Sequence, residues 1–307
     1  LGVDVAGFER ALEGQRGRSR SAQQAAKGGR GSAGDAGDEG WREVHQGSQR
    51  FVGYEAVEVE TRPLAFRATG DRVDLVLAEN PFYLESGGQI ADIGWIQGQG
   101  WRIAVDQVRK SARGAVVSGA WTAGVPFEPT LVTAAVDVPR RRNIERNHSA
   151  THLVHWALRK QLGPHVRQQG SLVEPDRLRF DFSHHGPIDP SQLDAIEFEV
   201  NEAIWANHDV EVRELPYPEA LALGAMAFFA DKYGDRVRVV TMGDSIELCG
   251  GTHVGTTGAL GLFRFAGQGG VAAGVRRIEA VTGAGADALA RSRTALLERA
   301  AEVVRTA

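Results

Sequence analysis

Two short motifs, far apart in the chain, set the strongest condition on how this sequence folds. The first is H-x-x-x-H, with His148 and His152 in the stretch NHSATHLVH. The second is C-x-x-x-H in ELCGGTHVG, with His253 and Cys249, the only cysteine of the chain. If one metal ion binds both pairs, the chain between them must fold so that a helix and a loop meet at one point.

Histidines at positions i and i+4 of a helix place their imidazoles side by side, where both can bind one ion. His155 lies near the same face, and we interpret it as a packing residue or as a partner of a ligand. Gly250 and Gly251 allow the loop to fold back, so that its cysteine and histidine face the same point. Nitrogen and sulfur donors suit tetrahedral zinc. The predicted Zn²⁺ ligands are His148, His152, Cys249 and His253.

Other readings of the two motifs stay open. H-x-x-x-H alone is common on amphipathic helices, so the pairs could be unrelated ordinary residues. A metalloprotease of the H-E-x-x-H type is excluded, because Ser149 occupies the position of the general-base Glu. Four protein ligands fit a closed structural zinc site. If water replaced one ligand, the metal could instead activate a hydroxide or polarise a carbonyl, and the sequence is compatible with both roles.

Composition limits the class of protein. The chain has 307 residues, 42% of them hydrophobic, which is enough for two or three globular domains. Its single cysteine excludes an internal disulfide and favours a reducing, cytoplasmic location. The sequence shows no membrane-spanning apolar run and no signal peptide. Because the net charge is -4, a nucleic-acid partner would have to bind local basic clusters, namely residues 140–142 with Arg146, or Arg276 with Arg277.

The first part of the chain predicts a helix, a linker and then strands. Apolar residues recur at helical spacing over residues 1–20, and the glycine-rich stretch KGGRGSAGDAGDEG follows at 27–40. Over residues 41–139, short alternating segments separated by turn residues predict a small β-barrel or sandwich. The loop NPFYLESGGQIADIG, residues 80–94, is richer in glycine and polar residues than a simple connection needs.

The second part predicts an α+β domain over residues 140–283. Its expected elements are a helix that ends at Gly163, the strand RLRFDF with three apolar side chains on one face, an amphipathic helix from Pro190, and the strands RVRVV, ALGLFRF and VRRIEAVTG. Residues 284–307 predict the start of a C-terminal helix. The fold class is thus α+β, with domains expected at 1–40, 41–139, 140–283 and 284–307.

Several segments together resemble the editing domain of the alanyl-tRNA synthetase family: NHSATHL, HVRQQGSLV, RLRFDFSH, ALALGAMAFF, SIELCGGTHVG and GVRRIEAVTG. The loop PFYLESGGQ resembles a loop of the β-barrel that precedes this domain, and FERALEGQRGRSR resembles the helix that joins the aminoacylation and editing regions. The resemblance covers the chain apart from the glycine-rich linker. It departs at Leu84, just before Ser245, and at Gln268, where Glu is usual; none of these residues is a predicted ligand.

The resemblance implies hydrolysis of mischarged seryl- and glycyl-tRNA(Ala), as a second sieve for amino acids that an alanine pocket does not reject. It implies that Thr151 helps to recognise the serine hydroxyl, that Gln168 acts in the hydrolytic pocket, and that zinc binds the four motif residues. The expected partners are tRNA(Ala) and mischarged aminoacyl-tRNA. Candidate tRNA contacts are Arg276, Arg277, Gly87, Gly88 and Gln89.

The resemblance also leaves alternatives. No segment matches the ATP-dependent aminoacylation core, and the chain begins with Leu1, so we expect either a portion of a synthetase that acts with remaining domains or a free-standing trans-editing deacylase. A non-catalytic tRNA-binding module with structural zinc is another alternative, although Thr151 and Gln168 have no role in such a site. Threonyl-type specificity is disfavoured by ELCGGTHVG together with ESGGQ.

Overall fold

The computed structural model describes residues 39–123, 130–227 and 234–305. The chain divides into two units, Leu1–Arg42 and Glu43–Ala307, and the elements below belong to the second unit, apart from the first residue of β1. The helix predicted over residues 1–20 and most of the predicted linker lie outside the described residues. The domain boundaries given above stay predictions.

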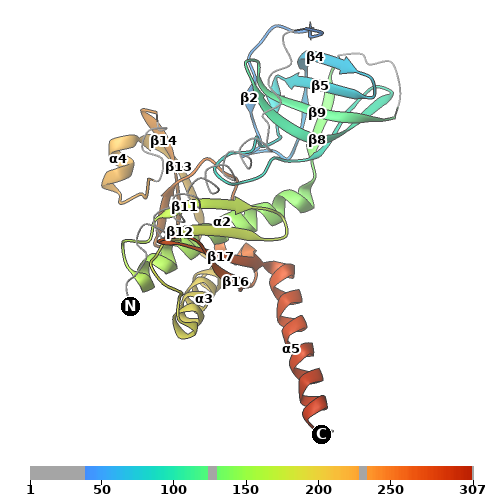
Figure 1. Cartoon of the computed structure of the whole chain (residues 1–307). Helices are drawn as coiled ribbons and strands as arrows, with labels where there is room; N and C mark the ends of the chain where they lie inside the picture. Colours follow the sequence, from blue (N-terminus) through green and yellow to red (C-terminus); the bar gives the residue numbers. More distant parts are fainter. Residues whose placement is uncertain (1–38, 124–129, 228–233, 306–307) are drawn as a thin grey trace, which may run out of the picture. The chain divides into compact units, whose positions relative to one another are not determined.

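The first half of the second unit is a curled antiparallel sheet of eight strands, in the order β1-β4-β5-β9-β8-β7-β10-β3 (Figure 1). A separate parallel pair consists of β2 (Arg50–Phe51) and β6 (Glu79–Asn80). The strands of the curled sheet are β1 (Arg42–Glu43), β3 (Glu58–Thr61), β4 (Pro63–Thr69), β5 (Arg72–Leu77), β7 (Gly94–Gly98), β8 (Trp101–Ser111), β9 (Gly114–Ala123) and β10 (Val132–Val136).

Alternation of apolar residues explains why these segments form strands. Along β8, the side chains of Trp101, Ile103 and Val105 are buried in the core of the sheet. The alternation then shifts by one residue to Val108, because the pairing with β9 has a bulge between Val105 and Gln107. The prediction of successive short strands is therefore confirmed. The predicted small β-barrel is corrected to a curled half-barrel, since no pairing among the described residues joins β1 to β3.

The second half of the unit is α+β, as predicted. A four-stranded antiparallel sheet has the order β11-β12-β17-β16, and the helices α2 and α3 share its apolar core. Leu178, Phe180 and Phe182 of β12 are fully buried in that core, which confirms that they share one face. The bounds are α2 (Val138–Leu162), β11 (Gln168–Val173), β12 (Leu178–Ser183), α3 (Pro190–Trp205), β16 (Phe263–Ala272) and β17 (Val275–Thr282).

A smaller sheet carries the metal-loop motif. Its order is β13-β14-β15, and the segment ELCGGTHVG starts with the last two residues of β15 and continues as a loop from Cys249. The segment ALGLFRF is not one strand as predicted, because its first residues close a short 3-10 helix, η2, and β16 begins only at Phe263. The bounds are β13 (Val210–Pro216), α4 (Tyr217–Ala222), β14 (Arg236–Met242), β15 (Ser245–Leu248) and η2 (Thr257–Leu260).

Capping residues fix the ends of α2, the helix that carries two predicted ligands. The side chain of Asp137 accepts a hydrogen bond from the backbone N–H of Arg140, and Pro139 lies in the first turn. At the other end, Gly163 has a φ of 110°, and its N–H donates to the carbonyl of Arg159. The end predicted at Gly163 is confirmed.

A buried ion pair joins α2 to the loop NPFYLESGGQIADIG. The Arg141 side chain is fully buried, pairs with Asp92, and donates to the carbonyls of Gly53 (2.7 Å) and Pro81 (2.9 Å). Asp92 also accepts the backbone N–H of Tyr83 at 2.7 Å. Arg141 is therefore not part of a surface basic cluster, which corrects that prediction. Its contacts instead hold the loop against the start of α2.

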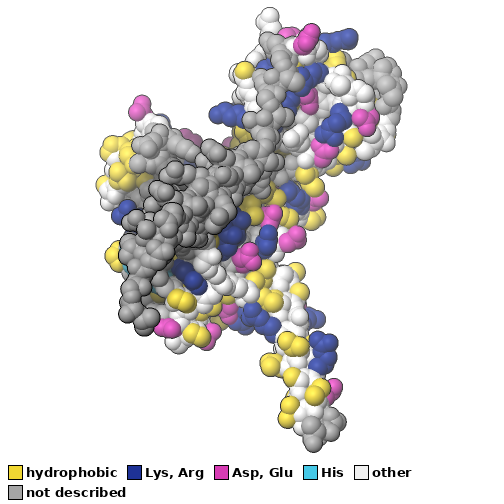
Figure 2. Space-filling model, in the orientation of Figure 1, with side chains coloured by type: hydrophobic (Ala, Val, Ile, Leu, Met, Phe, Trp, Pro, Cys, Tyr) yellow, Lys and Arg dark blue, Asp and Glu magenta, His cyan; other side chains and the backbone are white. Residues whose placement is uncertain are grey.

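The predicted C-terminal helix is present as α5 (Gly283–Arg305). Figure 2 shows hydrophobic side chains along it, and Leu296, Leu297, Val303 and Val304 are between 60% and 76% exposed. Among the helices of the described ranges, we find none with both the length and the apolar character needed to cross a membrane.

Candidate metal centre and its pocket

The structure brings both motifs together. One ligand atom from each of His148, His152, Cys249 and His253 lies within 4.8 Å of all the others. The Sγ atom of Cys249 is 3.4 Å from Nε2 of His148 and 3.3 Å from Nε2 of His253. Donors of a tetrahedral zinc site, with bonds of about 2.0–2.3 Å, stand roughly 3.3–3.6 Å apart. These four side chains, from α2 and the loop after β15, could therefore hold a metal ion.

The other ring nitrogen of each histidine faces a polar group. Nδ1 of His148 is 2.8 Å from Oε1 of Gln89, and Nδ1 of His253 is 3.1 Å from Oγ of Ser149. Nδ1 of His152 lies 3.4 Å from Glu247, which is an ion-pair contact rather than a formed hydrogen bond. Partners on Nδ1 orient an imidazole so that Nε2 faces the metal.

The buried Glu247 also contacts the histidine that the sequence leaves without a ligand role. Its Oε1 is 2.8 Å from Nδ1 of His155, and this imidazole is 1% exposed. The carboxylate of Glu247 thus contacts both His155 and the predicted ligand His152, which agrees with the interpretation of His155 as a packing residue or a partner of a ligand.

Close packing, and not backbone freedom, explains one glycine of the metal loop. A Cβ at Gly251 would lie 1.9 Å from Cε1 of His148, so no side chain fits there. A Cβ at Gly250 would meet only Tyr54 Oη, at 4.0 Å. Neither glycine has a positive φ. The expectation that both supply conformational freedom is therefore corrected: Gly251 provides space beside His148, and Gly250 does not.

Arg238 of β14 fixes the backbone of the same loop. Its Nη1 donates to the carbonyls of Cys249 (2.8 Å) and Gly251 (2.9 Å). Its guanidinium lies over the ring of Tyr54, 4.2 Å from the centroid, and Tyr54 donates its hydroxyl to the Gly250 carbonyl at 2.5 Å. Three successive loop residues thus have their carbonyls held from outside the loop, which limits the positions open to the cysteine.

The electrostatics of the metal-free cluster favour a thiolate. Burial alone would raise the pKa of the Cys249 thiol, but interactions with the neighbouring imidazoles, His148 foremost, outweigh burial and lower the pKa well below its ordinary value. Burial, aided by His148, lowers the pKa of His253 to about 3. Burial opposes protonation of His152 too, yet Glu247 and Cys249 raise its pKa to about 9. The cluster therefore holds a ready sulfur donor and a neutral His253.

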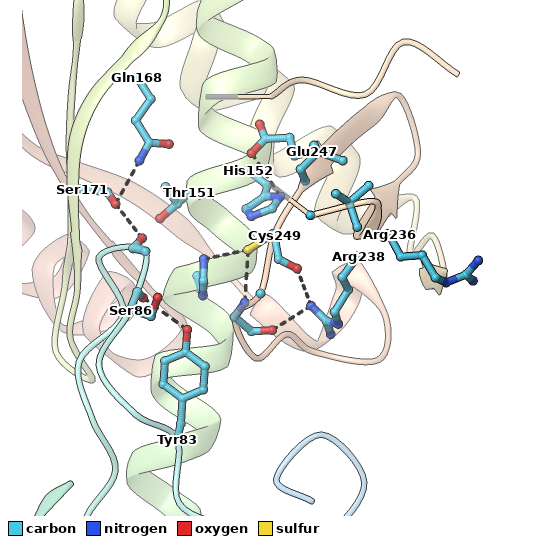
Figure 3. A pocket seen from close by; sticks show the side chains of 17 residues that line it. Tyr83, Ser86, Thr151, His152, Gln168, Ser171, Arg236, Arg238, Glu247 and Cys249 are labelled. Carbon is cyan, nitrogen blue, oxygen red and sulfur yellow. Dashed lines mark hydrogen bonds and ion pairs between the residues drawn. The ribbon is translucent and has the colours of Figure 1, made fainter. Parts of the chain in front are cut away.

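A cavity of about 410 Å³ opens beside this cluster (Figure 3). This volume lies within the range of small-molecule pockets. One side of the cavity is the loop that contains Tyr83, Ser86 and Gly87. The helix α2, the strands β11, β14 and β15, and the loop after β15 provide most of the other lining residues. His148, His152 and Cys249 are among the lining residues, so a bound metal would border the cavity.

The two predicted catalytic residues, Thr151 and Gln168, both line this cavity. The Oγ1 of Thr151 donates to the carbonyl of Asn147 at 2.8 Å. The Nε2 of Gln168 donates to Oγ of Ser171 at 3.2 Å, and Ser171 donates to the Gly87 carbonyl at 3.1 Å. Figure 3 shows Gln168 and Thr151 facing the same space. Their roles stay proposals, but the structure places them together with the four-residue cluster.

The loop residues predicted to contact tRNA lie in different settings. Gly87 lines the cavity, and Gly88 packs so tightly that an added Cβ would lie 2.1 Å from Oγ of Ser171. Gln89 is fully buried and bonded to His148 and Thr252. A direct tRNA contact by Gln89 does not fit this burial, so we interpret it as a neighbour of the metal centre instead.

The two predicted arginine contacts also differ. Arg277 is paired with Asp181 through two hydrogen bonds of 2.6 and 2.7 Å. The guanidinium of Arg276 donates to Oε1 of Gln268 at 3.3 Å, and no carboxylate of the described residues pairs with it. The charge of Arg277 is therefore balanced by a carboxylate, whereas the charge of Arg276 is better available to a phosphate.

Sequence reasoning missed Glu247, Arg238 and the metal-side position of Gln89. The only sequence signal for Glu247 was its place two residues before Cys249 in the motif ELCGGTHVG. No local signal marks Arg238 or Gln89, since each reaches the centre from a separate element.

Comparison with known proteins now gives the class. Residues 1–140 match the family model described as tRNA synthetases class II (A). Residues 237–279, which contain Cys249 and His253, match the model described as the threonyl and alanyl tRNA synthetase second additional domain. The chain thus combines part of a class II synthetase domain with a domain that threonyl and alanyl enzymes share.

Individual relatives narrow this class to one synthetase. The chain is 48% identical to the alanine–tRNA ligase of Chlorobaculum tepidum over 94% of its own length and 34% of that protein. It is 44% identical to that of Geobacillus thermodenitrificans over 100% of its own length and 35% of the relative. For the alanine–tRNA ligase of Thermus thermophilus the values are 45%, 98% and 36%. The chain is an alanyl-tRNA synthetase region that spans about a third of the length of these relatives.

Proposed function

We propose that this region hydrolyses seryl- and glycyl-tRNA(Ala), so that an alanyl-tRNA synthetase that contains it does not release mischarged tRNA. The observation that carries the proposal is that three members of the four-residue cluster, His148, His152 and Cys249, line one cavity of about 410 Å³ together with Thr151 and Gln168. A pocket that accepts alanine cannot reject glycine by size and rejects serine weakly, so a second hydrolytic site is the physical remedy.

Thr151 suits recognition of serine because of the hydrogen bond it already makes. Its hydroxyl proton is donated to the carbonyl of Asn147, so towards the cavity the oxygen can only accept. The hydroxyl of a seryl ester can donate to it, whereas an alanyl methyl group would leave it without a partner. One such neutral hydrogen bond contributes about 1 kcal/mol, or roughly a fivefold preference.

Gln168 suits the placement of the attacking water. Because Ser171 holds its Nε2, its Oε1 is available as an acceptor for a water proton. A bound Zn²⁺, held by three nitrogens and one sulfur, would supply positive charge beside the cavity. Since four protein ligands fill a tetrahedral shell, this charge favours orientation of the tRNA 3′ end over activation of a water. Arg276 then suits a backbone phosphate of the tRNA.

A second candidate is a tRNA-binding module whose zinc is purely structural, and the closed four-ligand set favours it. The two functions differ in what Thr151 does. Under the hydrolytic function, Thr151→Val lowers the ratio of seryl to alanyl ester hydrolysis by roughly fivefold, and Thr151→Ser keeps it. Unchanged ratios would remove Thr151 from the site. Absence of hydrolysis by the folded, metal-loaded chain would favour the binding module.

A further inference from the structure

Gln89 forms three hydrogen bonds at the metal cluster from a fully buried position. Its Oε1 lies 2.8 Å from Nδ1 of His148 and accepts the backbone N–H of Thr252 at 2.9 Å. Its Nε2 donates to Oγ1 of Thr252 at 2.9 Å. One side-chain amide therefore joins a predicted ligand on α2 to the loop that carries the other two.

The Thr252 backbone fixes which way this amide points. A backbone N–H can only donate, so the atom that faces it must be the amide oxygen and not the nitrogen. The same oxygen faces Nδ1 of His148, and a carbonyl oxygen can only accept. Nδ1 of His148 must therefore carry a proton, so Nε2, the atom 3.4 Å from Cys249 Sγ, is the ring nitrogen left to bind a metal.

We propose that Gln89 is a positioning residue of the metal centre, which holds His148 in the tautomer and orientation that a metal requires. The partners of the other two histidines, Ser149 and Glu247, fix the tautomer and orientation less firmly. The Ser149 hydroxyl at His253 can either donate or accept, so it selects no tautomer. Glu247 stands 3.4 Å from His152 without a formed hydrogen bond.

The position of Gln89 is itself fixed by the loop that precedes β7. The neighbouring N–H of Ile90 donates to the Val173 carbonyl at 3.3 Å, and the buried pair of Asp92 with Arg141 follows three residues after Gln89. A residue of the curled-sheet half of the unit thus sets the affinity of a metal whose ligands all lie in the other half. This inference needs only the metal centre of the proposed function, and not hydrolysis of any substrate.

The test is competition for Zn²⁺ between a chromogenic chelator and the whole chain, in three variants. Gln89→Leu removes both the acceptor and the donor. Gln89→Glu keeps an oxygen that accepts from His148 and Thr252, and the Thr252 hydroxyl can turn to donate to it. Gln97→Leu makes the same exchange at an exposed position of β7 and serves as the control. Circular dichroism reports the fold of each variant.

We expect Gln89→Leu to bind Zn²⁺ about 10- to 100-fold more weakly, as for other partners of metal-bound histidines. Gln89→Glu and Gln97→Leu should stay within a few-fold of the unaltered chain. Equal affinity in a folded Gln89→Leu chain would overturn the proposal. So would a folded Gln89→Glu chain that loses zinc, and this variant decides the question if the leucine variant does not fold. If the unaltered chain binds no metal, there is no metal centre for Gln89 to position, and this result would overturn the proposal as well.

Discussion

Gly251→Ala tests the packing of the metal centre with the addition of one methyl group. The added Cβ would lie 1.9 Å from Cε1 and 2.3 Å from Nδ1 of His148, and 2.9 Å from Oε1 of Gln89. Because the φ of Gly251 is not positive, alanine causes no backbone strain there. The change therefore acts through the collision alone, between a ligand, its hydrogen-bond partner and the loop.

The required movement gives the size of the effect. Ordinary van der Waals contact begins at 3.4 Å, so the imidazole or the loop must move by 3.4 − 1.9 = 1.5 Å. Metal–ligand distances tolerate only about 0.2 Å. His148 should thus leave the metal, and its hydrogen bond with Gln89 should break. We expect affinity for Zn²⁺ to fall at least about 100-fold, or about 2.7 kcal/mol, and the metal-free fold to lose about 1–3 kcal/mol from overpacking.

The assay measures zinc per chain after gel filtration, together with chelator competition and urea unfolding. Gly250→Ala is the matched control, because its Cβ would meet nothing closer than Tyr54 Oη at 4.0 Å. That variant should keep its zinc and its stability. If Gly251→Ala binds zinc as tightly as Gly250→Ala does, His148 is not a ligand in the observed position, and the geometry of the centre is wrong.

Three further predictions concern pH, tRNA and the buried ion pair. Because the pKa of His152 is raised to about 9 in the metal-free chain, this imidazole is protonated at neutral pH and must lose its proton to bind a metal. The affinity for Zn²⁺ should therefore rise about tenfold per pH unit up to about pH 9, and chelator competition that shows no such rise would contradict this prediction. Filter binding at several salt concentrations should show that Arg276→Gln weakens tRNA binding and lowers the salt slope of binding by about 1. Arg277→Gln should change both quantities less, because Arg277 is already paired with Asp181, and equal effects of the two variants would contradict this distinction. Asp92→Ala removes the carboxylate that is hydrogen-bonded to the buried Arg141, leaves only Glu145 at 4.0 Å, and should cost about 3–5 kcal/mol in urea unfolding. Glu79→Ala, at the exposed pair with Arg50, should cost about 0–1 kcal/mol, and similar losses in both variants would show that burial of the pair is unimportant.

Local pattern was sufficient for the elements that bury one face. The end of α2 at Gly163 and the shared face of Leu178, Phe180 and Phe182 follow from capping and period-two alternation. The prediction of a strand over the whole of ALGLFRF was wrong because a short apolar run does not distinguish a strand from a 3-10 turn. The open edge of the half-barrel was not predictable, since closure of a sheet depends on pairing between distant strands and not on the pattern within each one.

The four residues of the candidate metal cluster could be predicted to come together, but not the residues that hold them in place. His148 with His152 and Cys249 with His253 are local pairs whose spacing indicates chelation. Gln89 and Arg238 reach the centre through tertiary contacts, and nothing in their neighbouring sequence marks them. Arg141 shows the converse: a run of three arginines indicates a basic surface, yet the middle one is fully buried beside Asp92.

The central claim is that the metal cluster and the cavity beside it form a hydrolytic site that recognises a serine hydroxyl. The most direct test incubates the zinc-loaded chain with seryl-tRNA(Ala) and, separately, with alanyl-tRNA(Ala), and follows the loss of each ester. We predict that the seryl ester is hydrolysed several-fold faster than the alanyl ester. Loss of both at the same rate, or of neither by a folded chain with zinc bound, would contradict the claim.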